Sequence, residues 1–529
     1  MKNFKKRYAL IPLILAATMM SACGNKSENV SQENIDLSNY PINTDVELTY
    51  WMELDTNAST TVSNFADTPF AKEWMKKTGV PVRFIHPAQG QQTESFSLLV
   101  ASNDMPDIVY YTWHRALGGP DTSIRDEVII ELDELIDKYA SNLKNYLNQH
   151  KDVDKAVKTS DNHYYVFPFI RGDRELLVSS GTIMRQDWLE ELGLSVPTTY
   201  EEMETVLREF KTKKNANAPL SFVNTNLPYI LNYFSATNNF FLEDGKVKYG
   251  PMEPEYKNAI EVLKSWYDEG LLDKNYVSVD TKQLDSNILN ENTGVTFASG
   301  GSGLGKWLQT MEGENSSFEL VGIAPLVDPQ TGKAKFANVG NYYEGTGAAI
   351  SASSTHKELA AKFLDYLYSD EGHMLANFGI EGESYTMVDG YPTYTDLIMN
   401  NSDGLTVTQA MAQYQMAYSV GPFVQDKRYI EQYYELPEQK NALKAWESKV
   451  DEAQSSKLPL LLYTAEENDE YSQIMTEVKK YCDQMTATFI SGVTDISEYD
   501  SFIKRMEDLG INRAIEITQN AYERYNSRN

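Results

Sequence analysis

The sequence predicts an α/β protein with two successive α/β regions and a helical C-terminal end. Short apolar strand patterns alternate with amphipathic helices from about residue 45, and the alternation resumes after about residue 180. Beyond residue 400 the pattern is mainly helical. Strands that alternate with helices favour a mostly parallel sheet flanked by helices. At about 150 residues per domain, 529 residues allow several domains or one large two-lobed body.

The first element is a targeting signal. Basic residues at 2–7 precede an apolar stretch at 8–20, which is shorter than the roughly 20 residues of a membrane-spanning helix. Small residues then lead to Cys23, an order that resembles the lipobox of bacterial lipoproteins and implies a diacylglycerol on Cys23. An ordinary signal peptidase site is the alternative. Residues 1–22 are therefore expected to be removed, and residues 23–44 to form a lipidated, flexible tether.

The composition of the body excludes several classes of protein. Loss of the four basic residues in the signal lowers the formal charge from −29 to −33, so nucleic acid is excluded as a partner. Two cysteines exclude a disulfide scaffold and a cysteine-based zinc cluster. The 34 tyrosines exceed what a core needs, and amphipathic rings suit wet binding clefts.

The first α/β region reads as strand, helix, strand, helix, strand. Residues 46–50 alternate between apolar and polar side chains, which predicts a strand. A helix is predicted after it, with Thr68 as its N-cap, Pro69 in its first turn and Gly79 at its C-terminal end. Strands at 80–86 and 107–111 enclose a helix near 93–102. Because ligands of parallel sheets lie beyond the C-terminal strand ends, the residues found there are binding candidates: Trp51, Glu53, Tyr111 and Trp113.

The second region contains four recognisable elements. A capping box from Thr198 to Glu201 opens a helix with Met203, Val206, Leu207 and Phe210 on its buried face. A helix that stops at Gly270 and a strand at 294–299 follow. The segment 356–372 is predicted to be one helix that ends at Gly372. Trp188 and Trp266 are expected in the core, and Arg185 in an ion pair at a helix start.

Catalytic motifs are lacking. The sequence has neither HExxH nor G-x-S-x-G, and its six histidines show no ligand spacing. Residues 300–306 match G-x-x-x-x-G-K, but Trp307 replaces the Ser or Thr that binds Mg²⁺ in a P-loop. We interpret this loop as a flexible connection from strand to helix that could line a cleft. Paired carboxylates of a glycosidase are not detectable by spacing among 76 acids.

Six segments together resemble the solute-binding proteins of ABC transporters, family 1, and specifically the LplA-like lipoproteins. The segments are ASNDMPDIVYY (101–111), DNHYYVFPF (161–169), IMRQDWLEELGLSVPTTYEEMETVLREFK (183–211), WYDEGLLDKNY (266–276), GAAISASSTHKELAAKFLDYLYSDEG (347–372) and NFGIEGESYTMVDGYP (377–392). The resemblance implies a two-lobed, type II periplasmic-binding-protein-like fold with a hinge and a ligand between the lobes.

The resemblance also implies limits for the lobes. The N-lobe is expected to hold 45–168 and 350–400, and the C-lobe 172–345 and 401–529 with the helical C-terminal region. Hinge crossings are expected at 168–172 and 344–350. Closure of the lobes around the ligand would then present the closed form to permease subunits.

The implied function is capture of a carbohydrate, an oligosaccharide, at the extracytoplasmic face of the bacterial cell membrane by a lipid-anchored monomer that is not an enzyme. Aromatic rings and planar polar groups suit sugars. The remaining ligand candidates are Arg171, Ser299, Trp307, Tyr342, Tyr343, Glu344 and Glu383. A surface sensor or adhesion lipoprotein and, less favoured, a surface glycosidase are alternatives.

No cofactor and no metal are expected. Some relatives carry a calcium loop with an EF-hand-like run of oxygen ligands after the helix that corresponds to 199–211. Here residues 211–219, KTKKNANAP, contain three lysines (Lys211, Lys213 and Lys214), no glycine and no Asp or Glu. Because calcium needs six to eight oxygen ligands, usually with several carboxylates, we expect this site to be lost.

Overall fold

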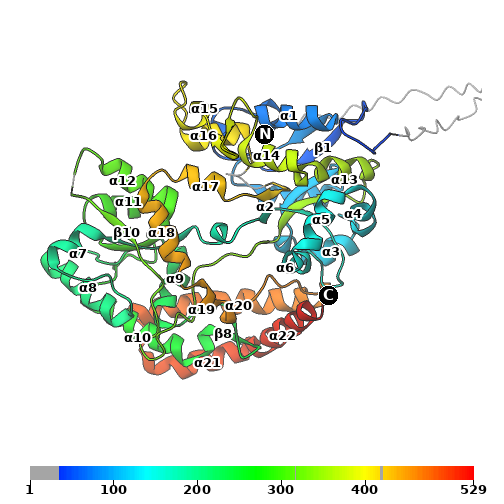
Figure 1. Cartoon of the computed structure of the whole chain (residues 1–529). Helices are drawn as coiled ribbons and strands as arrows, with labels where there is room; N and C mark the ends of the chain where they lie inside the picture. Colours follow the sequence, from blue (N-terminus) through cyan, green and yellow to red (C-terminus); the bar gives the residue numbers. More distant parts are fainter. Residues whose placement is uncertain (1–34, 316, 417–420, 529) are drawn as a thin grey trace, which may run out of the picture.

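The computed structural model describes residues 35–315, 317–416 and 421–528. The predicted signal at 1–22, Cys23 and the first part of the tether lie outside these residues. Figure 1 shows two lobes, one above the other, connected by several crossing segments. Of the helices in the described part of the chain, none combines the length and apolar character that a membrane crossing needs.

The sheet of the upper lobe has the strand order β2-β1-β3-β11-β4. β1 is parallel to both β2 and β3, as the alternation of elements predicts. β11 is antiparallel to β3 and β4. The second crossing is therefore not at 344–350, because 346–350 is a buried strand inside this sheet, and the chain crosses before it. The strands are β1 (Leu48–Trp51), β2 (Val82–Ile85), β3 (Ile108–Thr112), β4 (Phe167–Pro168) and β11 (Thr346–Ile350).

Helix α1 (Pro69–Thr78) has the predicted start and end. The Thr68 side chain accepts a hydrogen bond from the Ala71 amide, and Gly79 takes the left-handed conformation at φ 74°. A Cβ at Gly79 would also lie 2.1 Å from the Ile42 carbonyl oxygen, so glycine is required there. The other helices of this lobe are α2 (Gln92–Ser102), α3 (Gly119–Arg125), α4 (Asp133–Tyr139), α5 (Ser141–Gln149), α6 (Lys151–Ala156), α13 (Lys357–Asp365) and α14 (Asp370–Phe378).

The prediction of a single helix over 356–372 is wrong. α13 ends at Asp365, a short 3-10 turn follows, and Ser369 begins α14 by accepting a hydrogen bond from the Gly372 amide. Gly372 thus lies near the start of a helix and not at a stop. A Cβ there would be 1.9 Å from the Tyr366 carbonyl oxygen, which explains the glycine by close packing.

The sheet of the lower lobe is antiparallel, with the order β10-β6-β9. The helix predicted after 198 is α8, but its cap is Thr199, whose hydroxyl accepts from the Glu202 amide. The Glu202 carboxylate accepts the amide and the hydroxyl of Thr198, the residue before the cap, so the predicted capping box does not form. The elements are β6 (Ser180–Arg185), β9 (Val295–Ser299), β10 (Leu320–Gly322), α7 (Gln186–Leu192), α8 (Tyr200–Lys213), α9 (Leu227–Leu231), α10 (Pro254–Glu269), α11 (Thr281–Leu289) and α12 (Lys306–Met311).

Each lobe has a hydrophobic core of its own. The upper core draws on residues 42–170 and 343–376, and the lower one on 184–326 and 478–514. Trp188 and Trp266 are buried in the lower core as predicted. Residues 412–416 and 421–424, which the sequence assigns to the C-lobe, contribute Ala412, Met416, Phe423 and Val424 to the upper core instead.

The C-terminal region is helical, as predicted. α20 and α22 pack against each other and against the lower lobe, and both also reach the upper lobe. Cys482 is buried in the lower core beside Tyr256. Figure 1 shows α22 along the lower edge of the molecule, ending near α6. The remaining elements are α15 (Asp396–Met399), α16 (Val407–Tyr414), α17 (Arg428–Tyr433), α18 (Pro437–Glu447), α19 (Val450–Ala453), α20 (Ala465–Ile490), α21 (Tyr499–Asp508), α22 (Ile511–Ser527), β5 (Ile170–Arg171), β7 (Phe240–Glu243), β8 (Lys246–Tyr249), β12 (Tyr385–Val388), β13 (Tyr391–Tyr394) and β14 (Val424–Gln425).

Candidate functional site

Three segments that join the lobes lie side by side. β5 pairs in parallel with β14. On the other side of β5, the Arg171 amide donates to the Tyr342 carbonyl at 2.9 Å, and the Gly340 amide donates to Leu177 at 2.7 Å. A fourth segment follows α19 and places Leu460 and Leu462 against the upper core. Backbone pairing between the segments fixes their order, so this region is a built junction and not a set of loose linkers.

Two predicted ligand candidates meet at this junction. The Arg171 guanidinium lies 3.4 Å from the Glu344 carboxylate, and both side chains are about one-third exposed, at 30% and 39%. Lys457 donates to the Gly340 carbonyl beside them. Burial lowers the pKa of Lys457 to about 8, with a further contribution from Arg171, while Glu344 opposes the shift. No sequence motif marks Lys457, because it follows α19, far along the chain from Arg171 and Glu344.

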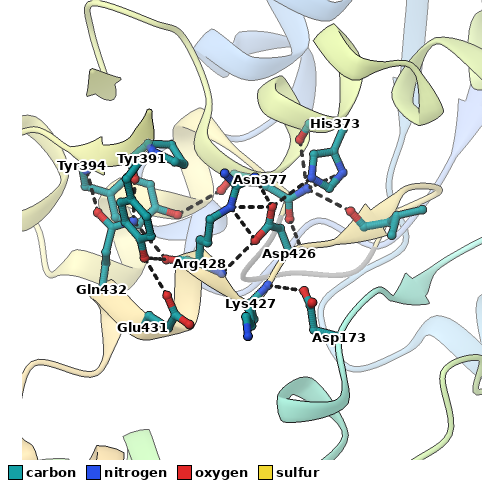
Figure 2. A network of polar contacts seen from close by, with 12 residues as sticks. Asp173, His373, Asn377, Tyr391, Tyr394, Asp426, Lys427, Arg428, Glu431 and Gln432 are labelled. Atoms are coloured by element: carbon teal, nitrogen blue, oxygen red, sulfur yellow. Dashed lines mark hydrogen bonds and ion pairs between the residues drawn. The ribbon is translucent and has the colours of Figure 1, made fainter. Parts of the chain in front are cut away.

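An Asp426-centred network fixes the β14 crossing (Figure 2). His373 lies 3.0 Å from the Asp426 carboxylate, which also accepts hydrogen bonds from the Arg428 side chain and amide. Burial alone would raise the pKa of Asp426, but the hydrogen bonds from His373 and Arg428 hold it well below its usual value. The next residue, Lys427, donates its amide to Asp173 after β5.

The predicted aromatic candidates are buried in this conformation. Trp51, Tyr111 and Trp113 surround Phe96 at the ends of β1 and β3, with the Phe96 and Tyr111 rings stacked 3.9 Å apart. Trp113 has no exposed surface, and its indole donates to the Gly347 carbonyl at 3.0 Å. These rings lie together at the strand ends, and they pack against one another. Their contact with a ligand stays a prediction.

Trp307 and Tyr343 are also buried, and they lie in different lobes. The Trp307 indole donates to Asp285 at 2.8 Å in the lower lobe. The hydroxyls of Tyr343 and Tyr165 are 2.8 Å apart in the upper core. Each ring therefore has a structural partner that accounts for its position.

The remaining candidates are at least partly exposed. Glu53 accepts the Gly90 amide, and Tyr342 lines a cavity described below. Ser299 lies at the end of β9 and hydrogen-bonds to Ser302 in the glycine-rich loop. Glu383 is exposed, and its carbonyl accepts from the Thr395 hydroxyl.

The glycine-rich loop at 300–305 connects β9 to α12, as predicted, by a π-helical turn. Its glycines permit close packing against the crossing that follows β14. A Cβ at Gly300 would lie 2.9 Å from the Tyr434 hydroxyl, and one at Gly305 would lie 2.3 Å from the Gln439 amide nitrogen. That amide donates to the Gly300 carbonyl. This hydrogen bond and the close packing hold the loop against the segment that follows β14.

Three cavities share lining residues around the junction. The largest of these three, about 530 Å³, lies between α6, residues 340–343, the segment after α19 and the end of α22. A second cavity of about 210 Å³ shares Lys457 and Leu458 with it. A third, of about 30 Å³, shares Tyr229 and Phe336 with the second. Tyr229, Phe336, Tyr522 and Tyr525 were not candidates from the sequence, since they come from three separate segments with no common motif.

One group in the described residues could hold a metal ion. Glu131, Asp133 and His163 offer ligand atoms that all lie within 4.8 Å of one another. His163 Nδ1 is 3.2 Å from the Asp133 carboxylate. Chain spacing did not reveal this group because His163 lies 30 residues after Asp133. All three side chains are about half exposed, which leaves them well hydrated without an ion.

Comparisons with known proteins agree with this architecture. Residues 57–374 match the family model described as bacterial extracellular solute-binding protein. The fructooligosaccharide ABC transporter substrate-binding protein FusA of Streptococcus pneumoniae is 23% identical and covers 99% of this chain and 98% of its own. Lipoprotein LipO of Bacillus subtilis is 26% identical over 66% of this chain and 70% of its own. The crystal structure of the alginate-binding protein AlgQ2 without calcium ion has a TM-score of 0.73 at 22% identity, covering 91% of this chain and 99% of that one.

Proposed function

Because the chain belongs to the bacterial extracellular solute-binding protein family, we propose that it captures an oligosaccharide between its lobes for an ABC importer. The observation that carries the proposal is the match to FusA, which extends over nearly the whole of both chains. The lobe limits expected from the sequence remain part of this proposal, with residues 412–416 and 421–424 moved to the upper lobe.

The cavities at the junction support a carbohydrate ligand. Tyr229 stacks on Phe297 with ring centroids 4.5 Å apart, so its ring is held in a fixed orientation. Tyr342, Tyr522 and Tyr525 line the largest cavity together with Asn341 and Gln454. Rings and planar amides are the groups that orient sugar faces and hydroxyls in clefts.

Capture is tested by thermal unfolding of the full chain, purified in mild detergent, against a panel of oligosaccharides. A ligand at 100 times its Kd should add about 2.7 kcal/mol to the free energy of unfolding. Small-angle scattering with a saturating ligand should show a smaller radius of gyration, because closure brings the lobes together. Hydrolysis of the bound oligosaccharide by the pure protein would instead support an enzyme.

We also propose that the protein is a monomer held at the extracytoplasmic face of the membrane by lipid on Cys23. The support is the lipobox-like order before Cys23 and the similarity to LipO, a protein named as a lipoprotein. Two acyl chains suffice for stable anchoring. Cys23→Ser should move the protein from the membrane fraction to the medium, whereas Cys482→Ser should leave it membrane-bound. Retention of the Cys23 variant would contradict the anchor.

A further inference from the structure

We infer that the upper lobe is the lobe held at the membrane, because residues 35–42 dock on it and shorten the length of chain between the body and the lipid. The inference rests on the proposed lipid anchor at Cys23 and adds which lobe that anchor holds. We call residues 35–42 the strap. The sequence predicts a flexible tether as far as residue 44, whereas the structure packs the strap against the body.

Apolar side chains attach the strap to the upper lobe. Ile35, Leu37 and Tyr40 are partly buried against the upper core, and Ile42 is part of that core with 3% of its surface exposed. The Ile42 amide also donates to the Thr78 carbonyl at 2.7 Å, at the end of α1. Burial of apolar surface favours the docked position, and the backbone hydrogen bond fixes where the strap lies.

Tyr40 fastens the strap to α13 and to the turn that follows this helix. Its hydroxyl donates a hydrogen bond to the Lys362 carbonyl, and the Lys362 ammonium lies 4.8 Å from the centre of its ring. The Tyr366 ring meets it edge-on, with ring centroids 5.2 Å apart. Burial, with a further contribution from Asp365, raises the pKa of Tyr40, so its hydroxyl keeps the proton that it donates at neutral pH. All of these partners belong to the upper lobe.

The docked strap limits how far the body stands from the membrane. Only residues 24–34 then separate the strap from Cys23, and a chain of that length spans at most about 38 Å. With the strap released, residues 24–42 would span up to about 65 Å. A compact body of about 500 residues is about 60 Å across. The shorter chain does not reach around such a body, whereas the longer one does.

The strap lies at one end of the molecule. Figure 1 shows the dark blue start of the described chain at the end of the upper lobe that carries β1 and α13, and α21 at the lower edge of the other lobe. An orientation with the lower lobe at the membrane would need a chain of about 60 Å, which residues 24–34 do not supply. Lobe closure therefore moves the lower lobe toward an upper lobe that is held in place.

The first test measures release of the full chain from membrane vesicles by chymotrypsin. Residues 24–34 contain no aromatic residue, leucine or methionine, so Leu37 is the first preferred site after Cys23. Cleavage there requires the strap to leave the lobe, because Leu37 packs against the upper core. The wild type should therefore be released slowly, as a chain that begins at Ser38.

Tyr40→Ala is the strap variant. The bond after Tyr40 leads to Pro41 and resists chymotrypsin, so the substitution removes no cleavage site. We expect release at least about tenfold faster than from the wild type, which corresponds to a strap weakened by about 1.4 kcal/mol. Tyr391→Ala is the matched control, since it removes another half-buried tyrosine, whose hydroxyl donates to Glu431, and it should leave the rate unchanged.

Trypsin shows whether the effect lies in the strap. Its only site between Cys23 and Leu37 is Lys26, so release by trypsin should be equally fast for the wild type and Tyr40→Ala. Chymotrypsin release of the wild type at the rate of Tyr40→Ala would show that the strap is not docked, and would overturn the inference.

The second test identifies the anchored lobe by energy transfer to acceptor lipids in the vesicle. A donor dye is attached through an azide-bearing amino acid in place of Glu358, exposed on α13, or of Asp500, exposed on α21. Transfer should be more efficient from position 358 than from position 500, and the difference should shrink in Tyr40→Ala. Equal transfer from the two positions of the wild-type strap would overturn the inference and leave the anchor standing. Failure of the full chain to stay with the vesicles would instead refute the anchor at Cys23, and the inference with it.

Discussion

The Arg528 guanidinium donates a hydrogen bond to the Thr159 carbonyl at 2.7 Å and so joins the end of α22 to the upper lobe. The same side chain donates to the carbonyls of Lys155 at 2.8 Å and Lys158 at 3.1 Å, at the end of α6. Because α22 packs into the lower core through Ile511 and Ala514, one residue holds both lobes.

Arg528→Ala should therefore destabilise the protein. Three carbonyls, two of them buried, would lose their donor, and an unsatisfied buried group costs about 1–3 kcal/mol. We expect a lower melting temperature in a thermal scan. Arg513→Ala is the matched control on the same helix, since its ion pairs with Glu470 and Glu516 are exposed and should contribute less than about 1 kcal/mol. Equal losses in the two variants would refute the bridging role of Arg528.

Trp113→Ala should lower stability in the absence of any ligand. Removal of a fully buried indole costs about 3–5 kcal/mol, and the hydrogen bond to Gly347 is lost as well. Tyr229→Ala is the contrasting variant, because its partly exposed ring lines two cavities and should affect affinity more than stability. Urea unfolding and calorimetry on both variants separate the two effects. A Trp113 variant with wild-type stability and weakened binding would restore that ring to the ligand site.

Asp426→Asn should make stability less dependent on acid pH. The folded state holds the Asp426 pKa below its unfolded value of about 3.9, so the ionised carboxylate stabilises the protein above that pH. The contribution is lost as pH falls from about 4 toward the folded pKa. The urea midpoint of the variant should be lower than that of the wild type at pH 6, and the difference between the two midpoints should be smaller at pH 3.5. An equal difference at the two pH values would show that the charge of Asp426 is not its source.

Calcium should have little effect on stability. α8 ends at Lys213, and Lys214 pairs with Glu191 where a calcium loop would need free carboxylates. The melting temperatures in excess EDTA and in millimolar Ca²⁺ should differ by less than about 5 °C. A change of 1 kcal/mol in the free energy of unfolding shifts the melting temperature by about 2–4 °C in domains of 150–250 residues. A larger rise would contradict the predicted loss of the loop. If His163→Ala abolished that rise, the ion would lie at the Glu131, Asp133 and His163 group.

Elements with complete local signals could be predicted from the sequence. α1 has its cap, first-turn proline and terminal glycine within the helix and its flanking residues, and Pro69–Thr78 forms as expected. The segment after Lys357 was misjudged because its apolar pattern continues through Ser369, while the decisive contact is the approach of Gly372 to Tyr366. Periodicity does not report such backbone contacts.

The site was less predictable than the fold. Strand-end position singled out Trp51, Tyr111 and Trp113, whose rings contact one another, but position alone does not say whether a ring faces the core or a cavity. The pair Arg171 and Glu344 came from the predicted crossings. Lys457 and Tyr229 needed the three-dimensional arrangement, because segments more than a hundred residues apart supply the cavity walls.

The burial of Cys482 makes the protein convenient for spectroscopic distance measurements. Burial raises the pKa of this thiol to about 12, so at neutral pH it is protonated and shielded from maleimide reagents. Once Cys23 carries lipid or is replaced, a pair of engineered surface cysteines, one on each lobe, would be the reactive thiols. Fluorophores or spin labels at such a pair would report lobe separation directly, without prior removal of the native cysteine.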